Sequence, residues 1–190
     1  MIALISGGCK NGKSFYAQRL ACQMALHQER PLYYLATMIP ADEEDLARIR
    51  RHRLERAGWG FDTVEQGYDL CSCLKPGRLT ASGQPVRPEG VFLLDSTTAL
   101  LSNEMFQPDG QMDRQVAQRV ADQLLDFAGQ VGGVVFVSDN IYSDPRRLDP
   151  STQCYRKGLA LIDRKLAQIC DQVIEVTYGL NYFYKGAEYL

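Results

Sequence analysis

The sequence predicts an α/β fold in which a mainly parallel β-sheet carries helices on both faces. Short, continuously apolar runs predict buried parallel strands, the first of them at residues 1–5. Stretches with helical spacing of apolar residues separate these runs, an alternation typical of a three-layer arrangement. A glycine-rich segment, residues 7–14, follows the first run and fits the pattern G-x-x-x-x-G-K-[ST]. Together these observations predict a P-loop NTPase-like fold.

The glycine-rich segment predicts a nucleotide-binding loop at the start of the first helix. It consists of Gly7, Gly8, Cys9, Lys10, Asn11, Gly12, Lys13 and Ser14. Backbone N–H groups of such a loop wrap a β-phosphate, and side chains at Gly7 and Gly12 would obstruct this approach or forbid the φ values it needs. We expect Lys13 to reach the β- and γ-phosphates and the Ser14 hydroxyl to bind Mg²⁺. A chance glycine-rich turn with a surface lysine is the alternative, and the flanking strand and helix argue against it.

Length, charge and cysteine content narrow the class of protein. The 190 residues suit a single nucleotide-binding domain, residues 1–190, and the net charge of −2 gives no broad basic field for nucleic acid or an anionic membrane. Without a membrane-spanning run or a signal segment, we expect a cytoplasmic location. The cysteines have no C-x-x-C spacing and the chain has two histidines, so we expect reduced core thiols rather than a zinc site. The cysteines are Cys9, Cys22, Cys71, Cys73, Cys154 and Cys170.

In the first third of the chain, helix and strand signals alternate. Residues 14–21 predict the first helix, and residues 31–37, a β-rich run opened by proline, predict the second strand. Acidic residues at 42–45 favour a helix start, and the basic stretch after them continues that helix as far as Gly58. Residues 61–65 alternate in the manner of a short strand.

The rest of the chain continues the alternation after a loop. Residues 75–90 are rich in Gly, Pro and Ser without periodicity and predict that loop. Apolar runs at 91–95 and 133–138 predict buried strands, and residues 116–127 carry a helical stripe that Gly129 closes. The remaining segments are a helix at 153–170, a strand at 172–177 and a tyrosine-rich tail at 182–184.

Asp95 ends one of the predicted buried strands. A carboxylate there, at the edge of the sheet that also holds the loop, is suited to bind Mg²⁺ directly or through water. Ser96 and Thr97 follow directly, so Asp95 is also a candidate N-cap of a helix. The phosphate loop favours the metal-binding interpretation.

The basic helix carries a histidine among arginines. Residues 48–56 read Arg-Ile-Arg-Arg-His-Arg-Leu-Glu-Arg, with His52 at the centre. Flanking guanidinium groups oppose protonation of the imidazole, which favours a neutral, nucleophilic His52 near pH 7, and the same cations would bind a triphosphate. By default such a histidine is an exposed surface residue, so from the residues alone both interpretations stay open.

Several motifs, taken in order, resemble those of one known family. They are Tyr34-Leu35-Ala36-Thr37, Arg-Ile-x-x-His-Arg-x-x-Arg at 48–56, aromatic-x-Thr-x-Glu at 61–65, Leu-Leu-acid-x-Thr-Thr with a later Asn at 93–103, Tyr155-Arg156, Leu166-Ala167 and Asp171-x-Val173. With the loop, they make the chain similar to the bifunctional adenosylcobinamide kinase / adenosylcobinamide-phosphate guanylyltransferase family of cobalamin biosynthesis. The resemblance covers nearly the whole chain, and its most specific part is Arg-Ile-x-x-His-Arg.

This resemblance implies a two-step enzyme. Members phosphorylate the aminopropanol hydroxyl of adenosylcobinamide with a nucleoside triphosphate, then transfer GMP from GTP through a histidine to the cobinamide phosphate. His52 matches that histidine, and Glu65 matches a contact to guanine, for which an acceptor-only carboxylate is suited. The resemblance implies catalytic roles for His52 and Lys13, metal binding by Ser14 and Asp95, a corrinoid substrate and a homotrimer. Beyond the loop, it implies nucleotide binding by Thr37, Met38, Ile39, Arg53, Arg56, Glu65 and Asp95.

Two segments depart from the family pattern. Members commonly carry Asn-Glu-Val-Gly where this chain has Asp139-Asn140-Ile141-Tyr142, and Asp163 replaces a common Asn. The survival of both chemical steps therefore stays open, as does the choice of ATP or GTP in the kinase step. Two other interpretations also stay open: a P-loop kinase of another small alcohol, without a covalent histidine, and a regulatory module that binds nucleotide without transfer.

Overall fold

A seven-stranded sheet forms the centre of the computed structural model, which describes residues 1–106, 111–142, 146 and 148–187, without the side chains of Arg48 and Glu55. The strands are β1 (Ile2–Gly7), β2 (Leu32–Ala36), β3 (Asp62–Glu65), β4 (Val91–Asp95), β5 (Gly133–Asp139), β6 (Gln172–Thr177) and β7 (Leu180–Lys185). Their order in the sheet is β3-β2-β4-β5-β1-β6-β7. All neighbours pair in parallel except β7, which is antiparallel to β6. The predicted α/β class is confirmed.

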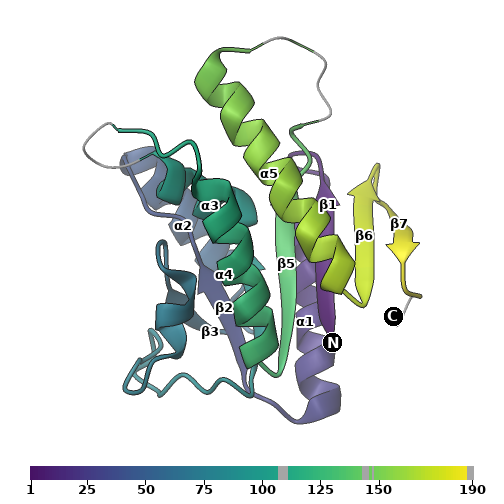
Figure 1. Cartoon of the computed structure of the whole chain (residues 1–190). Coiled ribbons are helices and arrows are strands. Elements are labelled where there is room, and N and C mark those ends of the chain that lie inside the picture. Colours follow the sequence, from purple (N-terminus) through teal and green to yellow (C-terminus); the bar gives the residue numbers. More distant parts are fainter. Residues whose placement is uncertain (107–110, 143–145, 147, 188–190) are drawn as a thin grey trace.

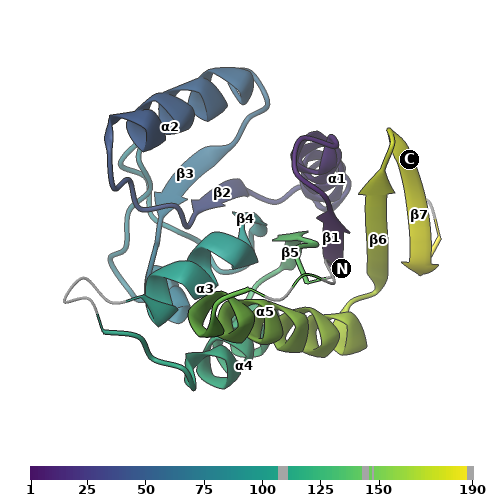
Figure 2. The ribbon, with the colours of Figure 1, turned by 90° about the horizontal axis from the view of Figure 1, so that it is seen from above.

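Helices cover both faces of this sheet. They are α1 (Lys13–Gln28), α2 (Glu43–Glu55), the 3₁₀ helix η1 (Leu70–Leu74), α3 (Thr97–Met105), α4 (Val116–Gln130) and α5 (Pro150–Ile169). Figure 1 shows α3, α4 and α5 in front of the sheet with α1 behind it, and the view from above in Figure 2 shows α1 and α2 together on the side opposite α5. This is the three-layer arrangement that the alternating sequence pattern predicts.

Two apolar clusters hold the layers together, one on each face of the sheet. Alternate residues of β5 divide between them: Val134 and Phe136 pack toward α3, α4 and α5, whereas Val135 and Val137 pack toward α1. A central parallel strand needs apolar residues at successive positions because both of its faces are buried. The continuous apolar runs in the sequence have this cause.

The carboxyl ends of the central strands meet at one edge of the sheet. Gly7 at the end of β1 pairs with Asp139 at the end of β5, and Asp95 at the end of β4 lies opposite Val137. Because parallel strands end on the same side, the loop after β1 and both carboxylates lie next to one another. Ligands in α/β proteins bind at such an edge.

The structure corrects several details of the sequence prediction. Helix α4 continues through Gly129 and ends at Gln130, since one glycine near an exposed helix end is tolerated. The tyrosine-rich tail forms the strand β7, whose residues are mostly exposed. Helix α3, which the apolar periodicity did not predict, begins directly after β4.

The predicted core location of the cysteines holds for only some of them. Cys73 and Cys170 are buried, and all six thiols are free. Cys9, however, is exposed in the loop after β1, so the core assignment was wrong there. Its position is set by the glycine-rich turn rather than by packing.

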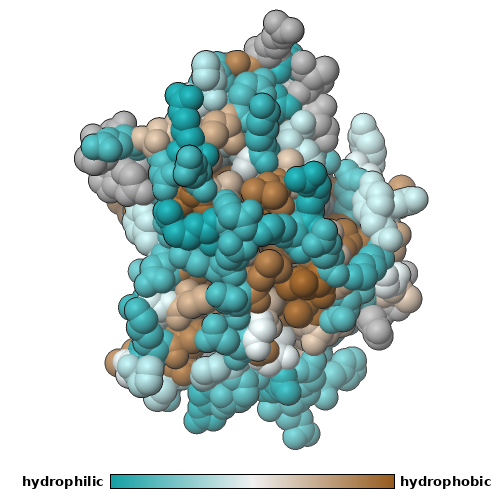
Figure 3. All heavy atoms as spheres, in the orientation of Figure 1, coloured by the Kyte–Doolittle hydropathy of each residue, from teal (hydrophilic) through white to brown (hydrophobic). Residues whose placement is uncertain are grey.

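The outer surface agrees with a chain of mixed charge. In Figure 3, hydrophilic side chains dominate the face formed by α3, α4 and α5, and hydrophobic ones form separate small patches. Within the part of the chain that the structure describes, no helix has the length and apolar character to cross a membrane.

Candidate active site

A cleft of about 980 Å³ lies between helix α2 and the carboxyl edge of the sheet. Its wall includes the start of α1, the ends of β2, β3, β4 and β5, and one side of α2. Predicted site residues on this wall are Lys13, Ser14, Met38, Ile39, His52, Arg53, Arg56, Glu65 and Asp95. The cleft thus brings Lys13 and Ser14, at the end of the phosphate loop, and the histidine of the basic helix into one space.

The loop after β1 has the backbone that its glycines predict. Gly12, the residue before α1, has φ of +93°, which glycine adopts without strain. A Cβ atom at Gly7 would collide with the backbone oxygen of Val176 on the neighbouring strand β6. Asn11 fixes the turn, because its side-chain amide donates to that same oxygen and its Oδ1 accepts from the N–H of Lys13 at 3.2 Å.

Lys13, the first residue of α1, is 8% exposed and contacts a residue that the sequence analysis did not assign to the site. Its Nζ is 2.7 Å from Oδ1 of Asp139 and donates to the backbone oxygen of Gly8 at 3.0 Å. Asp139 also lines the cleft. Asp139 follows a predicted apolar strand, 133–138, just as Asp95 ends the predicted strand 91–95. The reasoning that selected Asp95 could therefore have selected Asp139 as well.

Asp95 is the point on which several candidate residues converge. The Tyr34 hydroxyl donates to its Oδ2 at 3.1 Å. Burial raises the pKa of Asp95 above its usual range, which the Tyr34 hydroxyl partly offsets. His52, Lys13 and Ser14 also lie close enough to favour the ionised carboxylate. A cation bound next to this buried carboxylate would stabilise its ionised form.

The alternative role of Asp95 as a helix cap is wrong. The N-cap of α3 is Ser96, whose Oγ accepts from the N–H of Ala99 at 3.2 Å. The Asp95 carboxylate is therefore not required for capping.

These residues suit a magnesium ion that is bound together with a nucleotide. Ser14 and Asp95 are oxygen donors near one another at the end of the loop. Within the described residues, no group of three or more His, Cys, Asp and Glu side chains is arranged to hold a metal. Mg²⁺ needs no such cage, because it keeps several waters and takes phosphate oxygens beside one or two protein ligands.

Helix α2 carries His52 into the cleft. The helix begins where predicted, with Asp42 as N-cap accepting from the N–H of Asp45 at 2.8 Å and with acidic residues in its first turn. His52 is half-buried and lines the cleft together with Ile49 and Arg56, the residues three before and four after it. This spacing puts all three on one side of the helix.

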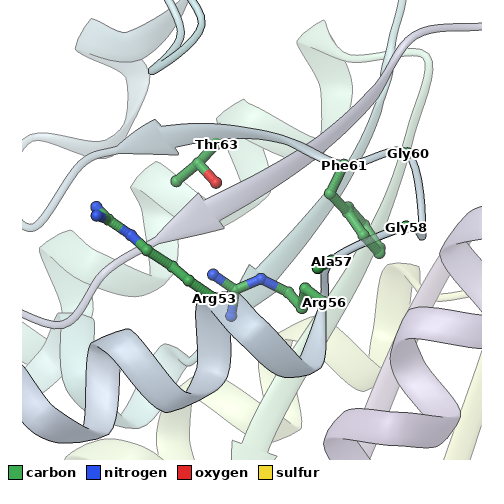
Figure 4. Close-up of a pocket in the computed structure, with 7 residues that line it drawn as sticks. All are labelled: Arg53, Arg56, Ala57, Gly58, Gly60, Phe61 and Thr63. Atoms are coloured by element: carbon green, nitrogen blue, oxygen red, sulfur yellow. The ribbon is translucent and has the colours of Figure 1, made fainter.

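Arg53 of α2 and Arg56, the C-cap of this helix, face the strands across a smaller pocket of about 450 Å³, shown in Figure 4. Arg53 forms an ion pair with Glu65, at the end of β3. Arg56 is 8% exposed, and its guanidinium lies over the Tyr34 ring, 3.4 Å from the ring centroid. Cationic groups held in this way are suited to bind phosphate, and the paired Glu65 carboxylate is a hydrogen-bond acceptor.

Thr37, like residues 7–12 of the loop, is a predicted site residue that is not part of the cleft wall. It is buried, and its hydroxyl donates to the Ser96 backbone oxygen and accepts from the Ser96 N–H, both at 2.9 Å. Asn103 donates to the backbone oxygens of Thr37 and Gly67 at 2.7 and 3.0 Å. Thr37 and Asn103 thus fix the backbone that presents Met38 and Ile39 to the cleft.

A buried carboxylate, Asp163 of α5, lies next to the end of β5, at one of the positions that depart from the family pattern. Asp163 accepts from the hydroxyls of Ser138 at 2.9 Å and Tyr142 at 3.0 Å, and its other oxygen is buried without a hydrogen-bond partner among the residues that the structure describes. Burial raises the pKa of Asp163 to about 6. Arg156 donates to the backbone oxygens of Tyr142 and Arg146, which ties these two residues to α5.

The strand order and the loop define a class of protein. The loop strand β1 and the Asp95 strand β4 are separated by β5, within a P-loop NTPase-like nucleotide-binding fold. A solved structure, the flagellar accessory protein FlaH of Methanocaldococcus jannaschii, superposes with a TM-score of 0.51 at 13% identity, over 97% of this chain and 78% of that one. At this identity the likeness supports the fold alone.

Sequence comparison then gives the family. The profile of the family described as cobinamide kinase / cobinamide phosphate guanyltransferase matches residues 3–183, and the chain belongs to this family of transferases. The bifunctional adenosylcobalamin biosynthesis protein CobP of Pseudomonas aeruginosa is 29% identical over 185 residues, which cover 96% of both chains. The corresponding protein CobU of Salmonella typhimurium is 26% identical over 192 residues, 95% of this chain and 98% of its own.

Proposed function

We propose that the protein phosphorylates the aminopropanol hydroxyl of adenosylcobinamide and then transfers GMP from GTP to the resulting phosphate, giving adenosylcobinamide-GDP. The observation that carries this proposal is the shared cleft, in which Lys13, Ser14 and Asp95 lie on the same wall as His52. Family membership supplies the substrates, and ATP and GTP are both candidates for the kinase step.

In the kinase step, the loop binds the triphosphate and orients its γ-phosphoryl group. Backbone N–H groups at the start of α1 and the Lys13 ammonium offset the phosphate charge, and the acceptor hydroxyl enters from the cleft. Mg²⁺ held by Ser14 and Asp95 would neutralise charge on the phosphate oxygens. Positioning and electrostatics are enough for this chemistry, so the step needs no covalent intermediate.

In the guanylyl step, a His52 ring nitrogen attacks the α-phosphorus of GTP and diphosphate leaves. The phosphate of cobinamide phosphate then attacks the same phosphorus, the P–N bond breaks, and His52 is regenerated. A neutral imidazole is suited to this role because it is a good nucleophile and a good leaving group. Arg53 and Arg56, one and four residues after His52, are the proposed phosphate ligands, with Glu65 as acceptor for the guanine N–H groups.

Incubation with GTP and Mg²⁺ followed by intact-mass measurement tests the covalent step. We expect the mass of one guanylyl group (GMP less one water) to be added, in an acid-labile and base-stable linkage, because a phosphoramidate has these properties. His52→Asn removes the adduct. His27→Asn is the matched control, since His27 is the other histidine of the sequence and lies exposed in the last turn of α1.

An adduct that persists after His52→Asn, or that maps to Lys10, Lys13 or His27, contradicts the assignment. Phosphorylation of another small alcohol without any adduct would favour a plain P-loop kinase. GTP affinity without turnover on any corrinoid would favour a regulatory module.

We further propose that residues 1–190 act as a single nucleotide-binding domain, in a cytoplasmic homotrimer. The continuous sheet supports the first part, and the family resemblance supports the trimer. Light scattering after size-exclusion chromatography tests the trimer, and cell fractionation tests the location.

A further inference from the structure

The carboxylate of Asp139 lies beside the phosphate loop, and the function proposed above does not use it. Asp139 pairs with Gly7 of β1, whereas Asp95 pairs with Val137, so Asp139 extends two residues beyond the level of Asp95. Val137 packs on the α1 face of the sheet, and Asp139, two residues later, faces the same side and contacts Lys13 of α1. The carboxylate is therefore next to the group that would hold the transferred phosphate.

The backbone holds Asp139 firmly in this position. Its N–H donates to Oγ1 of Thr98, in the first turn of α3, at 3.0 Å. The N–H of the next residue, Asn140, donates to the Gly7 oxygen at 3.0 Å. About a third of the side chain, 31%, remains exposed, and Asp139 lines the cleft. A fixed and accessible carboxylate is pre-organised for a ligand.

We propose that Asp139 is the general base of the kinase step. It accepts the hydroxyl proton of the alcohol while the alcohol oxygen forms its bond to the γ-phosphorus. The bond between that phosphorus and the bridging oxygen breaks, and the nucleoside diphosphate leaves with the electron pair. This inference rests on the proposed kinase activity.

Lys13 brings the base and the phosphoryl group within reach of one acceptor. Two acceptors that share one ammonium nitrogen lie about 4–5 Å apart, so a γ-phosphate oxygen on Lys13 would be about that far from Asp139. An alcohol oxygen poised for attack lies about 3–3.5 Å from phosphorus. Such an oxygen can donate its hydrogen bond to Asp139. The ammonium between them also reduces the repulsion between carboxylate and phosphate.

The other acidic groups on the cleft wall have different surroundings. Among the described residues, its carboxylates are Glu65, Asp95 and Asp139. Glu65 is paired with Arg53, and Asp95 lies next to Ser14, where the cation would bind. Tyr155 is a poor base because its hydroxyl donates to the Thr98 oxygen at 2.7 Å and burial raises its pKa. Asp139 is the carboxylate that remains for the alcohol. Because members of the family commonly carry Asn at this position and Glu at the next, a base at position 139 is part of this chain's departure from the family pattern, with Asp139 in place of the glutamate that the chain lacks.

Asp139→Asn tests the proposal, because the amide oxygen can still accept from Lys13 but cannot take a proton. With adenosylcobinamide as acceptor, we expect kcat for phosphorylation to fall about 10²- to 10⁴-fold. We expect the Kd for the nucleotide, measured by titration calorimetry, to change less than about fivefold. Asp126→Asn, an exposed substitution on α4, is the matched control and should leave kcat unchanged. Asp139→Ser should lose activity like the Asn variant, and circular dichroism checks the fold of both.

Each outcome decides between distinct conclusions. Unchanged kcat with tighter nucleotide binding would mean that Asp139 only neutralises Lys13 in the empty site, and would overturn the proposal. A parallel loss of nucleotide affinity in both variants would mean that Asp139 supports the loop, and would also overturn it. If the wild-type protein forms the His52 adduct but phosphorylates no cobinamide, the kinase half of the proposed function fails. If the wild type phosphorylates cobinamide and Asp139→Asn is equally active, the proposed role of Asp139 is refuted while the kinase activity itself stands.

Discussion

At the residue scale, the contacts of Lys13 connect the loop to the carboxylate edge of the sheet. Lys13 bridges Gly8 and Asp139, so the ammonium is already near its proposed working position. Such pre-organisation reduces the entropy that phosphate binding must remove from a long, flexible side chain.

We predict that Lys13→Ala abolishes turnover of nucleoside triphosphate with little effect on the unliganded fold. Asp139 would lose its partner, but its partial exposure lets water solvate the carboxylate, so the free energy of unfolding should fall by less than about 2 kcal/mol. Urea unfolding measures the stability, and a coupled assay measures the turnover. Wild-type turnover in the variant would refute the phosphate-loop assignment.

Ser14→Ala and Asp95→Asn should weaken Mg²⁺-dependent nucleotide binding together. Both would act through one cation, so their effects on binding free energy should be less than additive in a double-mutant cycle. Titration of the four proteins with nucleotide and Mg²⁺ gives the coupling. Fully additive losses would argue that the two side chains act separately.

Asp163 should make the folded protein less stable as pH rises, because folding raises the pKa of its carboxyl group. Its pKa in the folded state, about 6, exceeds the ordinary value of 3.8, so between these values the folded state binds more protons than the unfolded state. Its contribution to stability is therefore lost as pH rises through this window and stays lost above it. The difference between the two pKa values corresponds to roughly 3 kcal/mol as an upper bound.

Asp163→Asn removes this titration. Relative to wild type, the free energy of unfolding of the variant should rise by about 2 kcal/mol between pH 4 and pH 7.5, as measured by urea unfolding at each pH. Carboxylates whose pKa is lowered by folding, such as Asp62 and Asp113, contribute stability that is lost as pH falls. Their contributions are the same in wild type and variant, so they cancel in the difference between the two. A difference that is independent of pH would show that Asp163 is not buried with a raised pKa.

At the element scale, close packing of α5 on its neighbours depends on one glycine. A Cβ atom at Gly158 would lie 2.9 Å from the Cβ of Ala117 on α4 and 3.3 Å from Leu101 on α3. The Ala117 Cβ cannot rotate away, because it is fixed to the helix backbone. Any side chain at position 158 must therefore move one helix relative to the other.

We predict that Gly158→Ala destabilises the protein by about 1 kcal/mol, although alanine is the better helix former. The gain in helix propensity, about 1 kcal/mol, is smaller than a typical overpacking cost of about 1–3 kcal/mol. Gly129→Ala is the matched control, since a Cβ there meets nothing within 4 Å, and it should stabilise α4 by about 0.5 kcal/mol. If both substitutions stabilise in thermal unfolding, α4 and α5 are less closely packed than described.

Elements buried on both sides were the most predictable from sequence. The runs at β1, β4 and β5 are continuously apolar because two faces of each strand are covered, and this pattern is local in the chain. Strand β7 lacks this signal because its residues are mostly exposed, and α3 is too short for a clear periodic stripe. Of the site, the loop, Asp95 and the basic helix carry local patterns. The pairing of Lys13 with Asp139 depends on which strand lies next to β1, which no local pattern specifies.

At the scale of the whole molecule, the cleft gathers segments that are far apart in the chain. Lys13 from α1, His52 from α2, Asp95 from β4 and Asp139 from β5 reach it because the parallel strands end on one side of the sheet. One cleft can then present a nucleotide to a hydroxyl acceptor and to a histidine. Conversely, the site depends on correct assembly of most of the sheet.

The central position of β1 also has a consequence for synthesis on the ribosome. Among the described strands β1 is made first, yet its two partners, β5 and β6, begin at residues 133 and 172. During most of translation the apolar segment before the phosphate loop therefore has neither neighbour to pair with, and unpaired apolar strands are prone to aggregate. The nascent chain would depend on chaperones for this interval, and its capacity to bind a nucleotide would arise late, once both partner strands have emerged from the exit tunnel.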